Sequence, residues 1–186
     1  MEALSAESKK RTNRVYMTEK NNNLLFPAAM SYGLALGLYW VVKYIFNMIS
    51  PYYPYWIVVY WGMSIIVPYL GYVLTKRYRD DLGGSITFGE AWRFGVLLYF
   101  FAALIVSVMH YVFYRFVAPP DYMANAVSQT IASLKQMNVD SQVIQSVEAL
   151  NFSPIHLALQ GILNNVLYGV VFSVPVALLL RRKQSV

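Results

Sequence analysis

The feature that most constrains this chain is a run of 20 residues, Phe94 to Phe113, in which His110 is the only ionisable side chain apart from tyrosines. A helix rises about 1.5 Å per residue, so a helix of this length covers the hydrocarbon core of a bilayer, which is about 30 Å thick. Composition agrees, because 13% of the residues are charged, whereas a soluble domain carries about a quarter. The run therefore predicts a membrane-spanning helix.

Three further apolar segments have the length of a membrane span. With the run above, they predict spans at 24–49, 55–75, 88–117 and 154–180. We expect an all-α membrane protein whose four transmembrane helices form a bundle, in a single domain over residues 24–183. Residues 1–23 are polar and basic, and we expect them to form a solvated cytoplasmic tail.

The lysines and arginines are unevenly distributed along the chain. Of the 15, five lie in the tail, four in residues 76–93 and three at the C-terminus, which leaves Lys43, Arg115 and Lys135. Cytoplasmic loops are enriched in positive charge, so both termini are predicted to be cytoplasmic. This distribution also indicates that the net charge of +6 faces lipid headgroups and not nucleic acid.

Residues 121–150 connect the third and fourth spans and form the longest segment outside the predicted spans. Apolar residues recur in it at helical spacing in two groups, which are separated by Asn138 and by Asp140, a predicted N-cap. We expect a short extracytoplasmic pair of amphipathic helices.

The third span begins with a recognisable helix-start signal. Thr87 and Glu90 have the T-x-x-E spacing of a capping box, so a helix is predicted to begin near Phe88. Arg93 lies three residues after Glu90 on the same helix face, where the two side chains can form an ion pair at the membrane interface. A functional role for these polar groups is the alternative.

Small residues recur every four positions on two spans, a pattern that lets helix backbones approach closely in lipid. On the first span they are Ala29, Gly33 and Gly37; on the fourth they are Gly161, Gly169 and Ser173, which form a small and polar stripe together with Asn165. The two stripes offer more close-packing surface than one small bundle uses. They predict a homo-oligomer or a complex with another membrane protein.

Polar side chains at membrane depth are functional candidates because burying them in lipid is costly. The candidates are Lys43, His110, Gln160, Asn164 and Asn165. The structural alternative for Lys43 is a lysine that extends to the interface, and for the two asparagines it is hydrogen bonding between helices. His110 and His156 lie toward the same end of their spans, but zinc normally needs three or four ligands, so hydrogen bonding is favoured over a metal site.

Motifs of catalysis are missing from the sequence. There is no cysteine, the spans contain no paired carboxylates, and no cofactor fingerprint or arrangement of nucleophile and base stands out. We therefore expect a protein that is not an enzyme and that has neither a cofactor nor a metal.

Three segments carry a resemblance to a known family: GGSITFGEAWRFG at 83–95, PPDYM at 119–123 and LYGVVFSVPVALLLRRK at 167–183. They resemble small inner-membrane proteins, typical of Bacteroidota, that are catalogued as domain of unknown function, family 4199. The resemblance implies four transmembrane helices and a bacterial inner membrane, and it supplies no activity. It also implies membrane glycosyltransferases that use polyprenyl-phosphate sugars as neighbours, and hence as candidate partners.

Together these features lead to two hypotheses of function. The first is a non-enzymatic accessory or assembly subunit that serves envelope lipid or glycan processes, and it depends on the small-residue stripes. The alternative is a small transporter or lipid-handling protein with a polar site at the membrane midplane, and it depends on the polar candidates.

Overall fold

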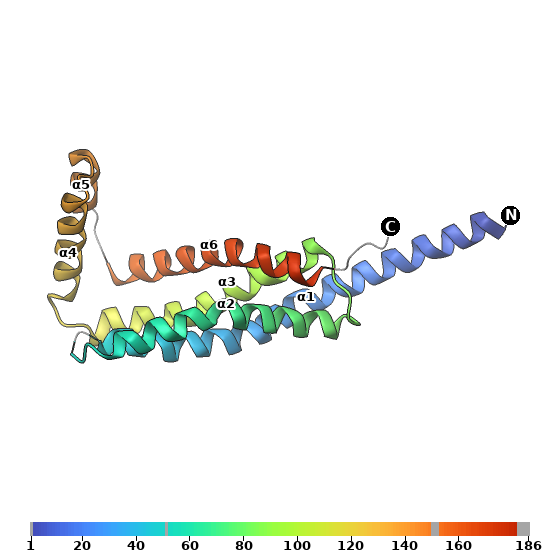
Figure 1. Ribbon diagram of the computed structural model, residues 1–186, viewed down its shortest axis with the longest axis horizontal. Helices are drawn as coiled ribbons and strands as arrows, with labels where there is room; N and C mark the ends of the chain where they lie inside the picture. Colours follow the sequence, from blue (N-terminus) through green and yellow to red (C-terminus); the bar gives the residue numbers. More distant parts are fainter. Residues whose placement is uncertain (1, 51, 150–152, 182–186) are drawn as a thin grey trace. The chain divides into compact units, whose positions relative to one another are not determined.

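The computed structural model describes residues 2–50, 52–149 and 153–181, and it describes side chains from Asn23 onward except at positions 123 and 126. Over these residues the chain forms six α-helices, one π-helix and no strand (Figure 1). They are α1 (Glu2–Ile49), α2 (Trp56–Asp81), α3 (Phe88–Val112), η1 (Phe113–Val117), α4 (Tyr122–Gln136), α5 (Ser141–Glu148) and α6 (Pro154–Leu180). The predicted all-α class is confirmed.

Four helical segments are long and apolar enough to cross a membrane. They are Asn23–Ile49 of α1, all of α2, Phe88–Val117 of α3 and η1, and all of α6. Each has between 26 and 30 residues, and at about 1.5 Å per residue each exceeds the roughly 30 Å of a hydrocarbon core. The chain is a multi-pass membrane protein with the four predicted spans.

Two helix boundaries differ from the prediction. The helix of the first span begins at Glu2, where the sequence predicted a tail up to residue 23. No proline or glycine precedes Pro27, and the many Ala, Glu, Lys and Arg residues favour a continuous helix. The helix of the second span continues past the predicted end near Thr75 to Asp81, and it stops where Gly83 and Gly84 have φ of 91° and 85°.

The chain divides into two compact units, and the single domain over 24–183 stays a prediction. The first unit comprises Met1–Val106 and Ile162–Val186, and the second comprises Ser107–Gly161. The first contains α1, α2, most of α3 and most of α6. The second contains the end of α3, η1, α4, α5 and the start of α6.

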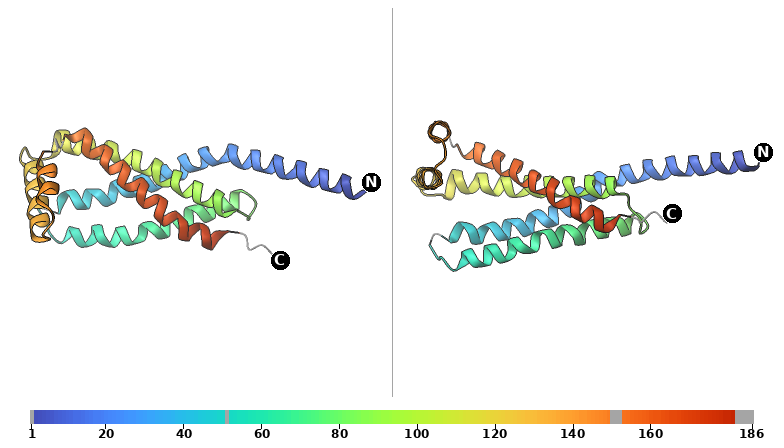
Figure 2. Two further views of the ribbon diagram at one scale, coloured as in Figure 1. Left: turned by 90° about the horizontal axis from the view of Figure 1, so that it is seen from above. Right: turned by 45° about the horizontal axis from the view of Figure 1, so that its top comes forward.

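In the first unit, α1 and α2 lie side by side and antiparallel (Figures 1 and 2). Polar and aromatic contacts join them at several levels. Tyr32 OH donates to Asp81 Oδ2 at 2.7 Å, and Tyr39 OH donates to the carbonyl of Met63 at 2.8 Å. Close to the connection between the helices, the rings of Phe46 and Trp56 stack with centroids 4.9 Å apart.

The small residues of α1 lie directly against α3. A Cβ atom built on Gly33 would come within 2.6 Å of Phe101 Cβ, and one built on Gly37 within 2.8 Å of Ile105 Cβ. Ala29 is fully buried. The backbones of α1 and α3 therefore approach as closely as the small-residue pattern allows.

The small residues of α6 are also used within the chain. In the first unit, Gly169 packs against Tyr99 of α3, and Ser173 packs against Gly95. The indole Nε1 of Trp92 donates to the carbonyl of Val170 at 3.3 Å. Contacts inside the chain thus account for both stripes, so the stripes no longer support the predicted oligomer or partner.

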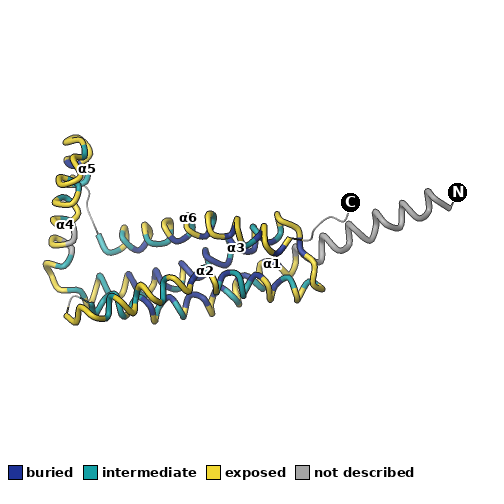
Figure 3. The backbone as a smooth tube through the Cα atoms, in the orientation of Figure 1, coloured by how far each residue is buried: buried dark blue, intermediate teal, exposed yellow. Residues whose placement is uncertain are grey.

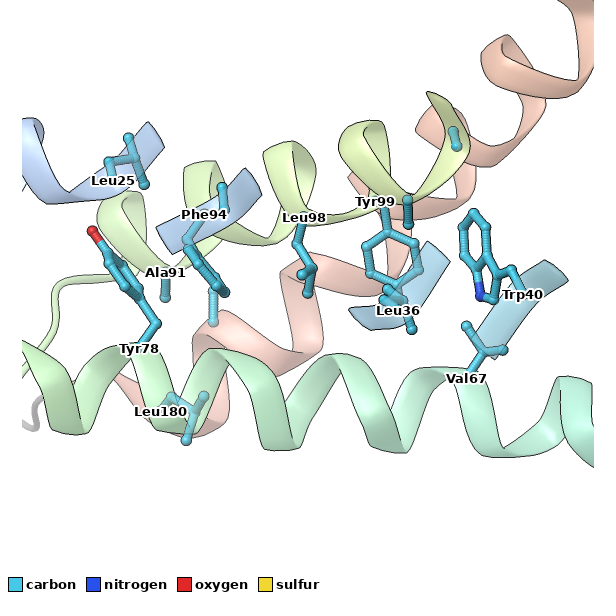
Figure 4. Close-up of a cluster of buried hydrophobic side chains, with 14 of the residues drawn as sticks. Leu25, Leu36, Trp40, Val67, Tyr78, Ala91, Phe94, Leu98, Tyr99 and Leu180 are labelled. Atoms are coloured by element: carbon cyan, nitrogen blue, oxygen red, sulfur yellow. The ribbon is translucent and has the colours of Figure 1, made fainter. Parts of the chain in front are cut away.

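The buried core of the first unit is aromatic as well as aliphatic (Figure 4). The rings of Tyr78 and Phe94 stack face to face with centroids 4.1 Å apart, and the rings of Trp40 and Tyr99 lie 5.8 Å apart. Leu98 of α3 is fully buried. Small residues make room for these rings where the helices touch. Gly71 and Gly169, for example, both lie against Tyr99.

In the second unit, α4 and α5 form the predicted helical pair. Asp140 is the N-cap of α5, and its Oδ1 accepts a hydrogen bond from the backbone N of Gln142 at 2.7 Å. Asn138 turns the chain between the helices with φ of 53°, a backbone conformation that asparagine tolerates better than most residues. The predicted break and cap are confirmed.

Candidate functional site

Lys43 of α1 lies within a cluster of aromatic rings. Its side chain is 7% exposed. Its Nζ lies 4.6 Å from the centroid of the Tyr44 ring, 5.2 Å from that of Tyr60 and 5.6 Å from that of Trp40. We call Lys43 and these three rings the lysine cluster. Each such contact of a cation with a ring face contributes on the order of 0.5–2 kcal/mol.

The packing of α1 on α2 builds the lysine cluster. Trp40 precedes Lys43 by three residues and Tyr44 follows it, so both rings flank the lysine on the same helix. Tyr60 comes from α2, and its ring lies 5.8 Å from that of Tyr44. Asn47, one helical turn after Lys43, is half-buried, and its side-chain amide hydrogen bonds to no described residue.

The neighbouring asparagines of α6 lie on different faces of the helix. Asn165 is 9% exposed, whereas Asn164 is exposed. Successive residues of a helix are about 100° apart, since 3.6 residues make one turn. Asn165 falls on the row of Gly169 and Ser173, which packs on α3. The sequence had grouped the two amides as one polar site, and the structure separates them.

The exposed row of α6 is polar in its first half. Asn164 and Tyr168 are one turn apart, and Tyr168 is 60% exposed with its ring stacked on that of Phe172 at 6.3 Å. Gln160, one turn before Asn164 on the same helix, is exposed as well. Neither amide side chain hydrogen bonds to a described residue.

The exposed face of α2 differs from this row in its chemistry. Both helices carry many exposed positions (Figure 3). The exposed large side chains of α2 within the span are Val58, Val59, Trp61, Ile65, Ile66 and Tyr69. Lipid chains can solvate this face, and no amide lies on it. The exposed row of α6 presents amide groups that lipid chains cannot satisfy.

His110 belongs to the second unit and is 8% exposed. Its ring lies 6.0 Å from that of Tyr114, and it packs against Gly161, where an added Cβ would lie 3.5 Å from His110 Nδ1. His156 Nδ1 lies 3.0 Å from Ser153 Oγ, and this oxygen accepts a hydrogen bond from the His156 backbone N at 3.4 Å. Among the described residues, no three or more His, Asp or Glu side chains gather as metal ligands would.

The predicted cap of the third span is present. Thr87 N donates to Glu90 Oε2 at 2.9 Å, and Glu90 N donates to Thr87 Oγ1 at 3.3 Å. These reciprocal bonds satisfy two of the free backbone donors of the helix start. Arg93 Nε donates to the carbonyl of Gly89 at 3.4 Å. Its ion pair with Glu90 stays a prediction.

Sequence reasoning missed the rings of the lysine cluster. It had connected neither Trp40 nor Tyr60 with Lys43. The spacing of Trp40 and Lys43, three residues apart on one helix face, was a usable signal. The contribution of Tyr60 depends on how α2 packs on α1, which the sequence does not give.

Comparisons with known proteins support a single assignment. No curated protein and no solved structure matches the chain. The model of one family, described as "Protein of unknown function (DUF4199)", matches residues 31–182. This range includes most of the first span, all of the other three and both amphipathic helices. The chain therefore belongs to the DUF4199 family of proteins of unknown function, as the three sequence segments had indicated.

Proposed function

We propose that this protein is a non-enzymatic accessory or assembly subunit of the bacterial inner membrane, which acts by binding a transmembrane helix of another membrane protein. The observation that carries the proposal is the exposed amide of Asn164 on α6. It lies ten residues from Pro154, or about 15 Å along the helix, which is near the middle of a hydrocarbon core of about 30 Å.

An amide at this depth needs a polar counterpart. Lipid chains offer neither donors nor acceptors, and leaving an amide unsatisfied there is unfavourable. A hydrogen bond between membrane helices contributes about 0.6–2 kcal/mol. A polar side chain on a neighbouring helix supplies that bond, and the leucines beside Asn164 supply apolar contact area around it. The small-residue stripes are not used in this argument, since the chain fills them itself.

The orientation that goes with this proposal places both termini in the cytoplasm. It is supported by the charge distribution, with 12 of the 15 lysines and arginines in the segments assigned to one side. The helical pair α4–α5 then lies outside the cytoplasm. Membrane glycosyltransferases that use polyprenyl-phosphate sugars are the candidate partners that the family resemblance suggested, in keeping with a role in envelope lipid or glycan processes.

Site-specific photo-crosslinking in the native membrane tests the proposal. A photoreactive phenylalanine analogue replaces Tyr168, beside Asn164, in one protein and Tyr69 of α2 in the control. The two tyrosines are 60% and 64% exposed, respectively. We expect position 168 to form a discrete adduct with another membrane protein and position 69 to react with lipid. Lipid adducts alone at both positions would contradict the proposal, and an adduct with a second copy of the chain would replace it with self-association.

A substitution separates the amide from the surrounding surface. Asn164→Leu removes the polar group and keeps the size of the side chain, whereas Leu167→Val changes an exposed apolar neighbour. We expect Asn164→Leu to weaken co-purification of the partner from lipid nanodiscs by about threefold to thirtyfold, which corresponds to one hydrogen bond between helices. Leu167→Val should leave co-purification unchanged.

A transporter or lipid-handling protein is the second candidate. It is favoured by Asn165, which is 9% exposed and whose amide hydrogen bonds to no described residue. A buried amide of this kind can bind a polar ligand or a water molecule. Asn165→Leu and His110→Phe variants test this candidate. If both fold and fully complement a deletion of the gene, neither residue is needed for function, and the transporter or lipid-handling hypothesis is refuted.

A further inference from the structure

Among the buried polar residues of the described part of the chain, Lys43 carries a formal charge. The other buried polar residues there are Thr75, Ser107, His110, Asn165 and Ser173, and none of them is a lysine, an arginine or a carboxylate. Lysines are almost never fully buried unless they are paired. The packing of the helices explains the cluster of rings, but it does not explain why a charged side chain is buried there.

No carboxylate pairs with Lys43 among the described residues, where the contacts of its ammonium are with the rings of Tyr44, Tyr60 and Trp40. Ring faces attract a cation through their quadrupole, but they carry no negative charge. An ammonium in a medium of low polarity gains most from an anion that accepts its hydrogen bonds. The rings of the cluster orient the ammonium, and no described residue supplies an anion to it.

The depth of Lys43 indicates which anion this is. Lys43 precedes Ile49, the last residue of α1, by six positions, or about 9 Å along the helix. Tyr52, Tyr53 and Tyr55 follow in the connection to α2 and are exposed, as is typical of residues at the level of the headgroups. Lipid phosphates lie at this level. Lys43 is thus close enough to the interface to reach a phosphate and deep enough to be shielded from water.

A second donor lies beside the ammonium. Asn47 follows Lys43 by four residues, which places it on the same face of α1, and its half-buried amide hydrogen bonds to no described residue. The Nζ of Lys43 is not among the enclosed polar atoms without a partner in the described residues, which are Trp40 Nε1, Tyr99 OH and Ser173 Oγ. The ammonium is therefore not fully enclosed by the described residues.

We propose that Lys43 and Asn47 bind the phosphate of a membrane lipid headgroup, at the end of the first span that faces the connection to α2. The ammonium supplies the charge and the amide a second hydrogen-bond donor. The rings of Tyr44 and Tyr60 hold the lysine in place, so little side-chain freedom is lost on binding. The inference is independent of the accessory role, because that role depends on α6.

The test measures lipid affinity of the delipidated full-length protein in neutral detergent. Three probes are titrated separately: phosphatidylglycerol, a diacylglycerol with the same acyl chains, and inorganic phosphate. Bound lipid is counted by native mass spectrometry, and the melting temperature is followed by tryptophan fluorescence. We expect phosphatidylglycerol to bind and to raise the melting temperature, because a ligand that binds only the folded state stabilises it. Diacylglycerol should do neither.

Substitutions assign the binding to this position. Lys43→Met should weaken phosphatidylglycerol binding about tenfold to hundredfold, as expected for the loss of one hydrogen bond from a charged donor, whereas Lys43→Arg should retain it within about threefold. Lys76→Met is the matched control. Lys76 is an exposed lysine near the other end of α2, so this variant reports general attraction between basic residues and anionic lipid.

The outcomes are distinguishable. Equal affinity for phosphatidylglycerol and diacylglycerol, or equal losses in Lys43→Met and Lys76→Met, would overturn the proposal. Inorganic phosphate that binds as tightly as the lipid, and competes with it, would uphold phosphate recognition and assign it to a soluble source. Should Lys43→Met fail to fold, Asn47→Leu and the comparison of lipids on the unmodified protein still decide the matter.

Discussion

The close contact between α1 and α3 gives the sharpest prediction for stability. Gly33→Ala adds a methyl group whose carbon would lie 2.6 Å from Phe101 Cβ and 3.1 Å from the carbonyl oxygen of Leu98. Gly62→Ala adds the same group to α2, where nothing lies within 4 Å. The two substitutions are chemically identical, both lie in spans, and they differ in their surroundings alone.

The size of the effect follows from the geometry. Ordinary van der Waals contact begins at 3.4 Å, so relief of the contact with Phe101 requires the helices to separate by about 0.8 Å. A gap of 0.5–1 Å forfeits roughly a quarter to a half of the dispersion energy of the contacts along the seam. Overpacking of this kind costs about 1–3 kcal/mol, whereas alanine in an open helix position gains up to about 1 kcal/mol over glycine.

Thermal unfolding in detergent, followed by tryptophan fluorescence, measures the difference. One kcal/mol shifts the melting temperature of a domain of this size by about 2–4 °C, so Gly33→Ala should melt about 2–12 °C below Gly62→Ala. The contacts involve a Cβ and a backbone oxygen, which no rotamer change can move, so an added Phe101→Ala substitution should not rescue Gly33→Ala. Equal melting temperatures for the two alanine variants would refute the close approach.

Three further predictions concern buried and capping polar groups. The hydroxyl of Tyr99 is enclosed without a partner among the described residues, so Tyr99→Phe should leave the melting temperature unchanged or raise it. Tyr39→Phe is the control, because it loses the hydrogen bond to Met63 and should lower the free energy of unfolding by about 0.5–1.5 kcal/mol. Thr87→Ala removes half of the capping box and should cost about 0.5–2 kcal/mol in the same assay, with Thr87→Ser as the variant that keeps the hydroxyl. Asp140→Ala removes the N-cap of α5 and should speed hydrogen exchange in Ser141–Glu148, whereas Asp140→Asn should not; unchanged exchange in the alanine variant would contradict the capping role.

The fold was largely predictable because membrane spans depend on few variables. Length and hydropathy gave all four spans, and the fourth agrees with α6 at both ends. The capping box at Thr87 and the N-cap at Asp140 are local signals, which do not require knowledge of the tertiary structure. The N-terminal part of α1 was missed because a polar, charged segment reads as a solvated tail, although its residues are good helix formers.

The candidate site was less predictable because it depends on which helix faces meet. The pattern of Gly33 and Gly37 predicts a close helix contact, but it does not say whether the partner is another copy or another helix of the same chain. In the structure the partner is α3 of the same chain, where Phe101 and Ile105 lie against these glycines. Lys43 shows the same limit. Its distance from the end of the span predicts a lysine that extends to the interface, and the contact with the Tyr60 ring depends on how α2 packs on α1.

Asn164 and Asn165 show how helical period and packing combine to give two separate surfaces. The period alone assigns them to different rows, yet it does not tell which row faces the protein. Contact between Gly169 and Tyr99 turns the row of Asn165 inward, so Asn164 must face outward. An outward amide needs a partner that both donates and accepts hydrogen bonds, whereas the Lys43 ammonium needs an anion. A protein helix meets the first requirement and a lipid phosphate the second, so each proposal can fail without affecting the other.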